Sequence, residues 1–556
     1  MMITFKSGLC FDTSNFFKNP MIISERIVLS CASSIMMVEY RLRLPSSMIS
    51  LNNIPSVRHQ SSAPDIDTSK QNAPETVTII PDLATLTRAD SYEPDFNSSL
   101  IGHLQSRFLV ESITSDDLFD MTSSGAQQKF KLYCGADPTA KSLHLGNLLP
   151  LMVLLHFHLR GHDVVTLVGG ATGAVGDPSG RDSERAQMEV AEREANVNNI
   201  SSQMETFIKR GVQYARSRNF PIIKTGQAES LNNLSWWSSI KLLDFLGTYG
   251  RHVRVSAMLG RDSIQSRLSS QSGLGFNEFT YQILQAYDFW HLFKHNGVNI
   301  QVGGNDQWGN ITAGTDLISR LQRAFSKNKN EKEVPAYGLT VPLLTTPSGA
   351  KFGKSAGNAI FINEQATSPF QLYQYFINVP DEMVSKLLKC FTLLPSSTIE
   401  NEVIAKHEED RAFRIAQRVL AREVTDLVHG VGTGEEMAYI TSFLFPTPDQ
   451  PFEEDISADK LLNAFRKSGI LVKLSSSELE FDELRLSTVL AKAMNKSKSE
   501  TRNLVKSGAI YLGIEREQLD DSNDVVLFDR ENHLIEDKLL LVRVGKQNYY
   551  VVEFTD

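Results

Sequence analysis

The chain has 556 residues, of which 41% are hydrophobic and 22% charged, a balance typical of a globular protein with about three domains. Its net charge of −9 excludes a wholly polybasic nucleic-acid binder, and its four scattered cysteines exclude a disulfide framework and a Cys-x-x-Cys site. The most apolar run, Leu148 to Leu155, is far shorter than the ~20 residues of a membrane span, so we expect no membrane partner.

The first 96 residues differ from the rest in composition. Residues 1–60 carry six basic and three acidic side chains and ten serines, without a periodic pattern long enough to build a core. Residues 61–96 carry two basic and seven acidic side chains and four prolines. A basic, serine-rich start followed by a polar linker is typical of a mitochondrial targeting segment and its spacer. The alternative is a disordered tail or an overlong gene model, in which case the protein is cytoplasmic.

From residue 97 onward, strand and helix patterns alternate. The expected elements are helices over 101–110 and 145–160 and strands over 130–134, 163–168 and 299–302. Gly161 would end the second helix, and double glycines follow the last two strands. Strand, glycine turn, helix and strand form a βαβ unit, so we predict an α/β fold around a parallel, doubly wound sheet. Ligands bind such sheets beyond the carboxyl ends of the strands.

Two glycine-rich stretches come close to standard nucleotide-binding motifs but do not match them. Ala171 stands where the first glycine of G-x-G-x-x-G is needed, so the stretch to Gly176 predicts no dinucleotide site. Only three residues separate Gly349 from Gly353, where a P-loop needs four. Neither motif therefore indicates the chemistry of the chain.

Three other segments fit together: Tyr133-Cys-Gly-Ala-Asp-Pro-Thr139, His144-Leu-Gly-Asn147 and Lys351-Phe-Gly-Lys-Ser355. The second resembles the HIGH motif, and the third the KMSKS loop, of class I aminoacyl-tRNA synthetases. With residues 168–180, 279–288 and 301–312 in this order, they resemble a bacterial-type tyrosyl-tRNA synthetase. The resemblance implies three domains: a Rossmann-like catalytic domain, an α-helical tRNA-binding domain and a small α+β S4-like RNA-binding domain, over 97–358, 359–474 and 475–556.

The same resemblance implies an activity and partners. The chain would activate L-tyrosine with ATP to tyrosyl-adenylate, release pyrophosphate and transfer tyrosine to the 3′ end of tRNA(Tyr). Mg²⁺ would arrive with ATP, without a metal site on the protein, and a homodimer would form through residues 190–290. The alternatives are an RNA-binding or splicing-type protein on this fold, a small-molecule nucleotidylyltransferase and a tryptophan-specific synthetase.

Adenylate formation depends mostly on positioning and on neutralising phosphate charge. His144 lies just before a predicted helix N-terminus, where free amides and the helix dipole favour phosphate. A single histidine at such a position is more often a cap or a packing residue, so the assignment depends on the other segments. The resemblance assigns catalysis to Thr139, His144, Lys351 and Lys354. It assigns ATP binding to Gly135, Asp137, Gly146, Asn147, Gly304, Asp306 and Ser355.

A tyrosine pocket must hydrogen-bond the phenol hydroxyl at its floor and hold the ammonium group at its mouth. The resemblance places Tyr133 and Asp288 at the hydroxyl, where leaving them unpaired would reject phenylalanine. Around the other end of the amino acid it places Asp177, Tyr281, Gln285 and Gln307. The spacing of four and three from residue 281 to residue 288 predicts one face of a helix.

Two basic segments are candidates for tRNA contact. The spacing of Arg411, Arg414, Arg418 and Arg422 predicts an amphipathic helix with an arginine stripe, for which a solvated face is the alternative. Residues 485–516 have a net charge of +5 and residues 517–556 of −6. In the basic half we predict a helix from about Ser497 to Gly508, with tRNA contacts from Lys498 and Arg502. A charged domain that docks on the catalytic core is the alternative.

Overall fold

The computed structural model divides the chain into two compact units, Met1–Thr76 and Val77–Asp556. Before residue 99 only the backbone of two antiparallel strand pairs is described: β1 (Met2–Thr4) with β2 (Cys10–Asp12), and β3 (Ser30–Cys31) with β4 (Ser34–Ile35). The predicted targeting segment and linker otherwise lie outside the described residues. From 99 to 555 the structure describes all residues except 124, 127, 182, 185–186, 223, 270–272, 327–331, 347–348, 350–351, 356–357, 447–456, 476–485, 520–532 and 546–547, and the side chains of 354, 355, 358 and 486.

A six-stranded sheet forms the centre of the region predicted to be the Rossmann-like domain, in the order β5-β10-β9-β6-β7-β8. Its strands are β5 (Ser112–Ile113), β6 (Lys131–Ala136), β7 (Asp163–Val168), β8 (Ala228–Asn232), β9 (Ile300–Gly304) and β10 (Tyr337–Val341). All neighbouring pairs are parallel except β5 with β10. The predicted α/β fold with a parallel sheet is confirmed.

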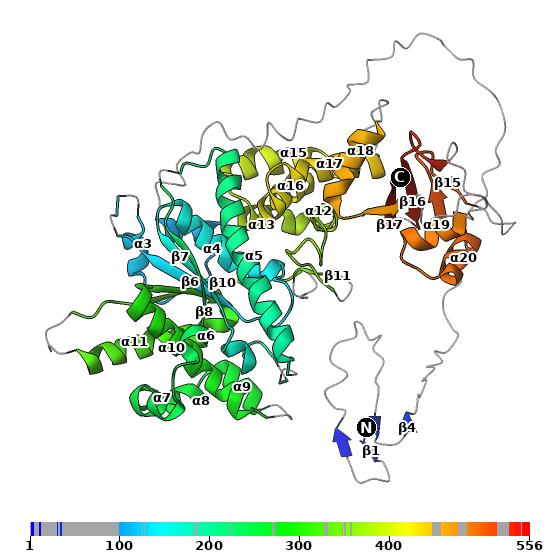
Figure 1. Cartoon of the computed structure of the whole chain (residues 1–556). Helices are drawn as coiled ribbons and strands as arrows, with labels where there is room; N and C mark the ends of the chain where they lie inside the picture. Colours follow the sequence, from blue (N-terminus) through cyan, green and yellow to red (C-terminus); the bar gives the residue numbers. More distant parts are fainter. Residues whose placement is uncertain are drawn as a thin grey trace, which may run out of the picture. The chain divides into compact units, whose positions relative to one another are not determined.

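Alternating side chains of the strands face two separate cores. Leu132 and Cys134 of β6 belong to one apolar cluster, while Tyr133 between them belongs to the other. Because successive strand residues point to opposite faces, the clusters lie on opposite sides of the sheet. Helices α4 (Leu148–Leu159) and α5 (Val190–Ser217) cover the first face, and α10 (Phe276–Asn296) and α11 (Trp308–Phe325) the second (Figure 1).

The predicted helix over 145–160 is confirmed as a short 3₁₀ turn, η1 (Leu145–Asn147), that continues into α4. Every residue of α4 except Pro150 is buried, so its position against the sheet is fixed by packing on all sides. Gly161 follows with φ +92°, a left-handed conformation that favours glycine. The helix predicted over 101–110 is shorter: α2 spans Leu100–Ser106, and Phe108 follows with φ 57°.

The helical region after the sheet is built around α16 (Ile415–His429), twelve of whose 15 residues are buried. Its other long helices are α12 (Pro369–Ile377), α13 (Asp381–Phe391), α17 (Thr433–Leu444) and α18 (Ala458–Ser468). The prediction of one helix carrying four arginines is wrong, because Arg414 has φ 52° and interrupts it. Arg411 lies in a separate 3₁₀ turn, η6 (Arg411–Phe413). Arg414, Arg418 and Arg422 are half-buried, so no continuous exposed stripe forms.

A second sheet closes the chain, in the order β13-β17-β16-β14-β15. Its strands are β13 (Leu471–Ser475), β14 (Ile510–Leu512), β15 (Glu517–Gln518), β16 (Leu539–Val544) and β17 (Asn548–Thr555). Helices α19 (Leu486–Ala493) and α20 (Lys498–Lys506) belong to the same core. Ser497 caps α20 by accepting from the Glu500 amide, so the helix begins where the sequence predicts. Because β13 pairs with β17, this sheet begins at Leu471, a few residues before the predicted start of the last domain at residue 475.

Shorter elements connect these parts. They are α3 (Asp117–Met121), η2 (Thr172–Ala174), α6 (Leu234–Trp237), α7 (Leu242–Thr248), η3 (Gly250–His252), α8 (Val255–Leu259), α9 (Asp262–Leu268), η4 (Asn305–Gln307), β11 (Lys354–Ser355), β12 (Asn358–Ala359), α14 (Ser396–Thr398), η5 (Ile399–Ile404) and α15 (Ala405–Glu409). Over the described part of the chain, no helix combines the length and apolar character needed to cross a membrane.

Candidate active site

The hydroxyl of Tyr133 is a buried polar group without a partner. The residue is 1% exposed on β6, and its oxygen has no hydrogen bond among the described residues. Burial raises the pKa of this phenol well above its usual value, so the hydroxyl keeps its proton. The ring packs against Phe289 with centroids 5.4 Å apart. An unpaired buried hydroxyl is costly, and a ligand hydroxyl would satisfy it.

Asp288 is fully buried on α10, and three side chains of one segment bind its carboxylate. The indole nitrogens of Trp236 and Trp237 donate to Oδ1 at 2.8 and 2.7 Å, and Asn233 Nδ2 donates to Oδ2 at 3.0 Å. Burial raises the pKa of Asp288 to about 7, and the three donors oppose that rise. Sequence reasoning missed all three donors; the signal in the sequence is a Trp-Trp pair in a chain with four tryptophans.

The predicted face of α10 is confirmed, since Tyr281, Gln285 and Asp288 all lie on this helix at one-turn spacing. Tyr281 donates its hydroxyl to Asp137 Oδ2 at 2.8 Å. Thr172 donates to the other oxygen of Asp137, also at 2.8 Å. Asp137, which the resemblance grouped with ATP, therefore lies in contact with the predicted amino-acid pocket.

Three of the four residues predicted around the amino-acid backbone, Asp177, Gln285 and Gln307, form one hydrogen-bonded network. Gln307 Nε2 donates to Asp177 Oδ2 at 2.7 Å. Asn310 Nδ2 lies 3.1 Å from both Gln285 Oε1 and Gln307 Oε1, so it bridges α10 and the start of α11. Asn310 was missed by sequence reasoning. The structure thus brings all six predicted tyrosine-binding residues to one side of the sheet or to the loops at its carboxyl edge.

His144 caps η1 with a reciprocal pair of hydrogen bonds. Its ring Nδ1 accepts from the Gly146 amide, and Asn147 Oδ1 accepts from the His144 amide, both at 3.0 Å. Because Nδ1 is an acceptor in this arrangement, the neutral ring carries its proton on Nε2. The exposed imidazole can therefore donate from Nε2 to a phosphate oxygen. Asn147, in place of a second histidine, holds the turn instead of presenting a charge.

The backbone around the KMSKS-like loop contacts the same turn. The Leu145 amide donates to the Ile360 carbonyl at 3.0 Å, and His144 forms an isolated bridge with Phe361. The Gly353 amide donates to the Tyr375 hydroxyl at 3.0 Å. In the short hairpin of β11 and β12, residue 354 pairs with 359. Lys351 and the side chains of Lys354 and Ser355 lie outside the described residues.

Predicted ATP-binding residues border the carboxyl ends of β6 and β9. Gly135 and Asp306 are exposed, and Gly304 and Thr139 are half-buried. A Cβ on Gly304 would lie 2.4 Å from Asp306 Oδ1, and one on Gly146 would lie 2.9 Å from His144 Cε1. Glycine at both positions therefore leaves the neighbouring polar side chain room beside the backbone.

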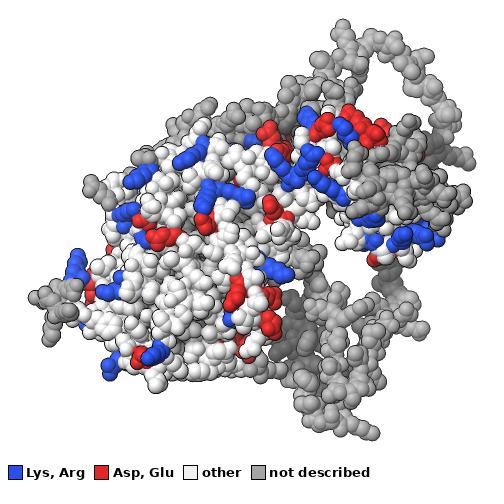
Figure 2. All heavy atoms as spheres, viewed as in Figure 1, with Lys and Arg blue, Asp and Glu red and all other residues white. Residues whose placement is uncertain are grey.

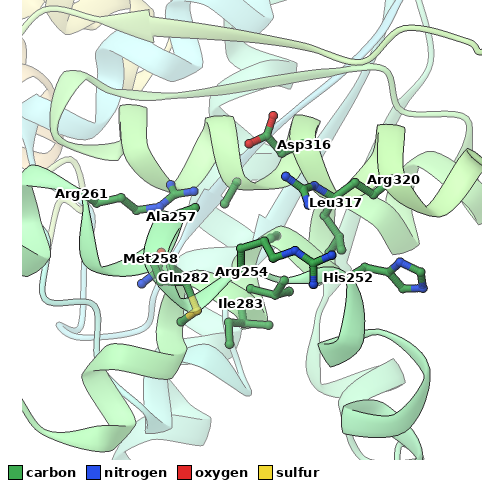
Figure 3. Close-up of a pocket in the computed structure, with 13 residues that line it drawn as sticks. His252, Arg254, Ala257, Met258, Arg261, Gln282, Ile283, Asp316, Leu317 and Arg320 are labelled. Carbon is green, nitrogen blue, oxygen red and sulfur yellow. The ribbon is translucent and has the colours of Figure 1, made fainter.

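A separate pocket lies on the other side of α10 (Figure 3). It has a volume of about 400 Å³, open to solvent, and Gln282, Ile283 and Ala286 of α10 contribute to its wall. Arg254, Arg261 and Arg320 line it together with Asp316. No residue predicted for tyrosine or ATP lines this pocket.

The residues predicted to contact tRNA lie in two regions, around the start of α16 and on α20. On the face drawn in Figure 2, Lys and Arg side chains gather over α12 and α16 and again over α20. Arg411 is exposed and pairs with Glu408 at 2.6 Å. Lys498 is exposed at the start of α20, and Arg502 is half-buried one turn later. Within the described ranges, no group of three His, Cys, Asp or Glu side chains could hold a metal ion.

Comparison with known proteins matches residues 125–445 to the family model described as tRNA synthetases class I (W and Y). The chain is 46% identical to the mitochondrial tyrosine–tRNA ligase of Saccharomyces cerevisiae over 459 residues, which cover 82% of this chain and 89% of the relative. It is 38% identical to the tyrosine–tRNA ligase of Staphylococcus haemolyticus over 458 residues, 82% of this chain and 100% of the relative. A C-terminally truncated mitochondrial tyrosyl-tRNA synthetase of Aspergillus nidulans superposes with a TM-score of 0.57 at 34% identity, over 62% of this chain and 94% of that one.

Proposed function

The chain belongs to the class I tyrosyl-tRNA synthetases and is a mitochondrial tyrosine–tRNA ligase, and we propose that the α10 pocket selects tyrosine while the η1 turn and the loop after it act on ATP. Tyrosine, ATP and tRNA are its partners. The single observation that supports the assignment of tyrosine to the α10 pocket is the buried Tyr133 hydroxyl, which lacks a hydrogen-bond partner among the described residues.

Tyrosine would bind with its phenol hydroxyl at Tyr133 and Asp288. A tyrosine hydroxyl can accept from Tyr133 and donate to the Asp288 carboxylate, and so satisfies both groups at once. Phenylalanine would bury both without a partner, a penalty that a polar site can use for discrimination. At the other end, Asp177, Tyr281 and Gln285 would hold the ammonium group, with Gln307 near the carboxylate.

ATP would lie across the carboxyl ends of β6 and β9, with its phosphates at η1. The His144 Nε2–H group would donate to a phosphate oxygen as the tyrosine carboxylate attacks. Thr139 would contact the phosphates beside it. Lys351 and Lys354 would neutralise the departing pyrophosphate when the loop closes. The ribose and base would lie against Gly135, Gly146 and Gly304, with Asp306 beside the ribose, and the remaining contacts would come from Asn147 and Ser355.

Mg²⁺ would enter the site bound to ATP. Mg²⁺ in such sites is commonly held mainly by phosphates and water, so it would need few ligands from the protein. When bound, the ion would draw charge from the leaving pyrophosphate. The residues named above would orient the two substrates around it.

A tyrosine-dependent exchange of pyrophosphate into ATP tests the first half-reaction. We expect exchange with L-tyrosine and far less with phenylalanine or tryptophan at equal concentration. Comparable exchange with tryptophan would contradict the pocket assignment. No exchange from intact protein with any amino acid would contradict the enzyme function and favour an RNA-binding protein on the same fold.

A homodimer would form through the segment between the two halves of the sheet. This segment exposes large apolar side chains that a monomer rarely leaves to water. They are Leu242 (70% exposed), Leu243 (80%), Leu246 (51%), Val255 (59%) and Phe276 (81%). Sedimentation should give a dimer for the parent chain and a monomer for Leu243→Asp. The control Leu343→Asp, at an exposed leucine outside the segment, should remain a dimer.

The tRNA would be held by the helical region and the C-terminal sheet domain, which we propose to be S4-like. The exposed basic start of α20 and the arginines from 411 to 422 supply the positive charge. The affinity that phosphate contacts provide falls as the salt concentration rises. Added salt should therefore weaken tRNA binding and change tyrosine-dependent exchange little.

A further inference from the structure

Both oxygens of Asp288 are occupied by donors from α6 and from Asn233, the residue between β8 and α6. Oδ1 accepts from two indole N–H groups, those of Trp236 and Trp237, and Oδ2 accepts from Asn233. An ionised carboxylate has about four acceptor positions, and an indole nitrogen can only donate. Three positions are thus filled within the protein, which leaves one for a ligand.

Aromatic contacts hold both indoles in place. Trp236 stacks on His291 with centroids 4.3 Å apart and an interplanar angle of 16°. Trp237 contacts Phe245 at 5.2 Å and Tyr287 at 5.0 Å, with its ring steeply inclined to both. Neither indole can turn away from Asp288 without breaking these contacts, so the two N–H groups are preorganised donors.

We propose that Trp237 is a positioning residue for tyrosine selection, which together with Trp236 fixes Asp288 as an ionised acceptor with a single position left for the hydroxyl of the substrate. This inference rests on the proposed tyrosine-binding role of Asp288. A carboxylate in this state accepts only a hydroxyl that can donate, which tyrosine has and phenylalanine lacks. Trp237 thereby acts on selection through Asp288.

The protonation of Asp288 depends on the second indole N–H group. Burial raises the pKa of Asp288 to about 7, the three N–H donors lower it, and the charge of Asp137 raises it. The other titratable groups nearby are Tyr133 on β6 and, on α10, Tyr281, Tyr287 and the Trp236-stacked His291. Burial also raises the pKa of the tyrosines and lowers that of His291 to about 4, so these groups stay neutral near pH 7. Loss of a donor therefore raises the pKa of Asp288 further and leaves the carboxyl mostly protonated at neutral pH.

The test is Trp237→Phe, which keeps an aromatic ring and removes the N–H group. Tyrosine-dependent pyrophosphate exchange would be measured from pH 5.5 to 9 at several tyrosine concentrations. We expect the acid limb of kcat/KM for tyrosine to move up by about one pH unit, and KM at pH 7 to rise about fivefold with little change in kcat. The preference for tyrosine over phenylalanine should fall by a similar factor.

Trp290→Phe is the matched control, because Trp290 is a buried tryptophan of the same aromatic cluster that stacks on Phe293 instead. It loses the same volume and should keep the parent pH profile. If Trp237→Phe does not fold, Trp236→Phe removes the other N–H group from the same oxygen and should give the same shift. An unchanged acid limb and unchanged selection in a folded, active variant would overturn the positioning role. Lack of exchange by the parent chain would instead overturn the proposed function.

Discussion

The two ends of the proposed active site are constructed in different ways. At the tyrosine end, Tyr133 and Asp288 are buried, and three side chains hold the carboxylate. At the phosphate end, His144 is exposed and held by its own turn, and the loop of Lys351 is tied to that turn through backbone contacts. One end is fixed before the substrate arrives, while the other presents an exposed histidine on a short turn.

This difference follows from what each end must do. Selection between tyrosine and phenylalanine depends on leaving buried polar groups unpaired in the wrong complex, which requires a site that cannot relax. Rate enhancement depends on contacts that strengthen only as charge moves to the leaving pyrophosphate. A rigid phosphate end that bound ATP equally well in the ground state would gain affinity without gaining rate.

The strongest test of the comparison is His144→Ala. It removes a donor that acts mainly in the transition state, so kcat for adenylate formation should fall about 10²–10³-fold. Tyrosine affinity, measured by equilibrium dialysis, should stay within about twofold of the parent, since no contact at the tyrosine end changes. His295→Ala, at an exposed histidine in the last turn of α10, is the control and should change neither quantity. Equal losses of rate and tyrosine affinity would contradict the separation of the two ends.

Tyr133→Phe should have opposite effects on function and stability. Without the hydroxyl, discrimination against phenylalanine should fall about tenfold, which corresponds to one hydrogen bond of ~1.4 kcal/mol. The ligand-free protein should become more stable by about 1 kcal/mol, because a buried unpaired hydroxyl is removed. Activity with the two amino acids and thermal unfolding measure these effects.

Tyr214→Phe is the matched control for a buried tyrosine. Its hydroxyl donates to Glu423 at 2.7 Å, within a buried network that also pairs Arg218 with Glu423 and Asp426. Its loss should therefore lower the free energy of unfolding and leave amino-acid selection unchanged. The same sign of stability change in both variants would mean that the Tyr133 hydroxyl is already satisfied in the free protein.

The sequence predicts those parts of this site that depend on local patterns. The strand at 163–168, the turn before α4 and the face of α10 follow from hydrophobic runs, glycine positions and helical spacing. The break at Arg414 could not be predicted in this way, because neither glycine nor proline marks it. A non-glycine residue in the left-handed region depends on tertiary packing, here around a helix buried along most of its length.

Spacing rules also cannot predict hydrogen bonds between side chains that are distant in the chain, because these too depend on tertiary packing. Trp236 and Trp237 lie more than 50 residues before Asp288, and only the fold brings their N–H groups to its carboxylate. The contact between Asp137 and Tyr281 crosses 144 residues. The family resemblance supplied the residues that we propose touch the substrates, whereas the groups that hold those residues came from the structure.

Tyr375→Phe sharpens the comparison at the phosphate end. The Tyr375 hydroxyl accepts from the Gly353 amide inside the KMSKS-like loop, so its loss should weaken the attachment of the loop at this residue. We expect kcat for adenylate formation to fall about threefold to tenfold, the effect of one hydrogen bond, with tyrosine KM unchanged. Tyr439→Phe, whose ring contacts Lys460 on α18, is the control and should leave the rate unchanged. A higher tyrosine KM in Tyr375→Phe would show that the loop also shapes the tyrosine end.

The smallest effect should come from the C-terminal domain, which marks the limit of the comparison. Lys498 and Arg502 lie one turn apart at the basic start of α20, a helix that packs into the hydrophobic core of the C-terminal sheet. Lys498→Ala with Arg502→Ala should weaken tRNA binding severalfold and reduce its salt dependence by about one unit of log–log slope per lost phosphate contact. Tyrosine-dependent exchange should stay at the parent level, because that half-reaction needs no tRNA. Lys332→Ala, at an exposed lysine of the catalytic region, is the charge control, and an equal loss of tRNA affinity there would mean that α20 contributes only net charge.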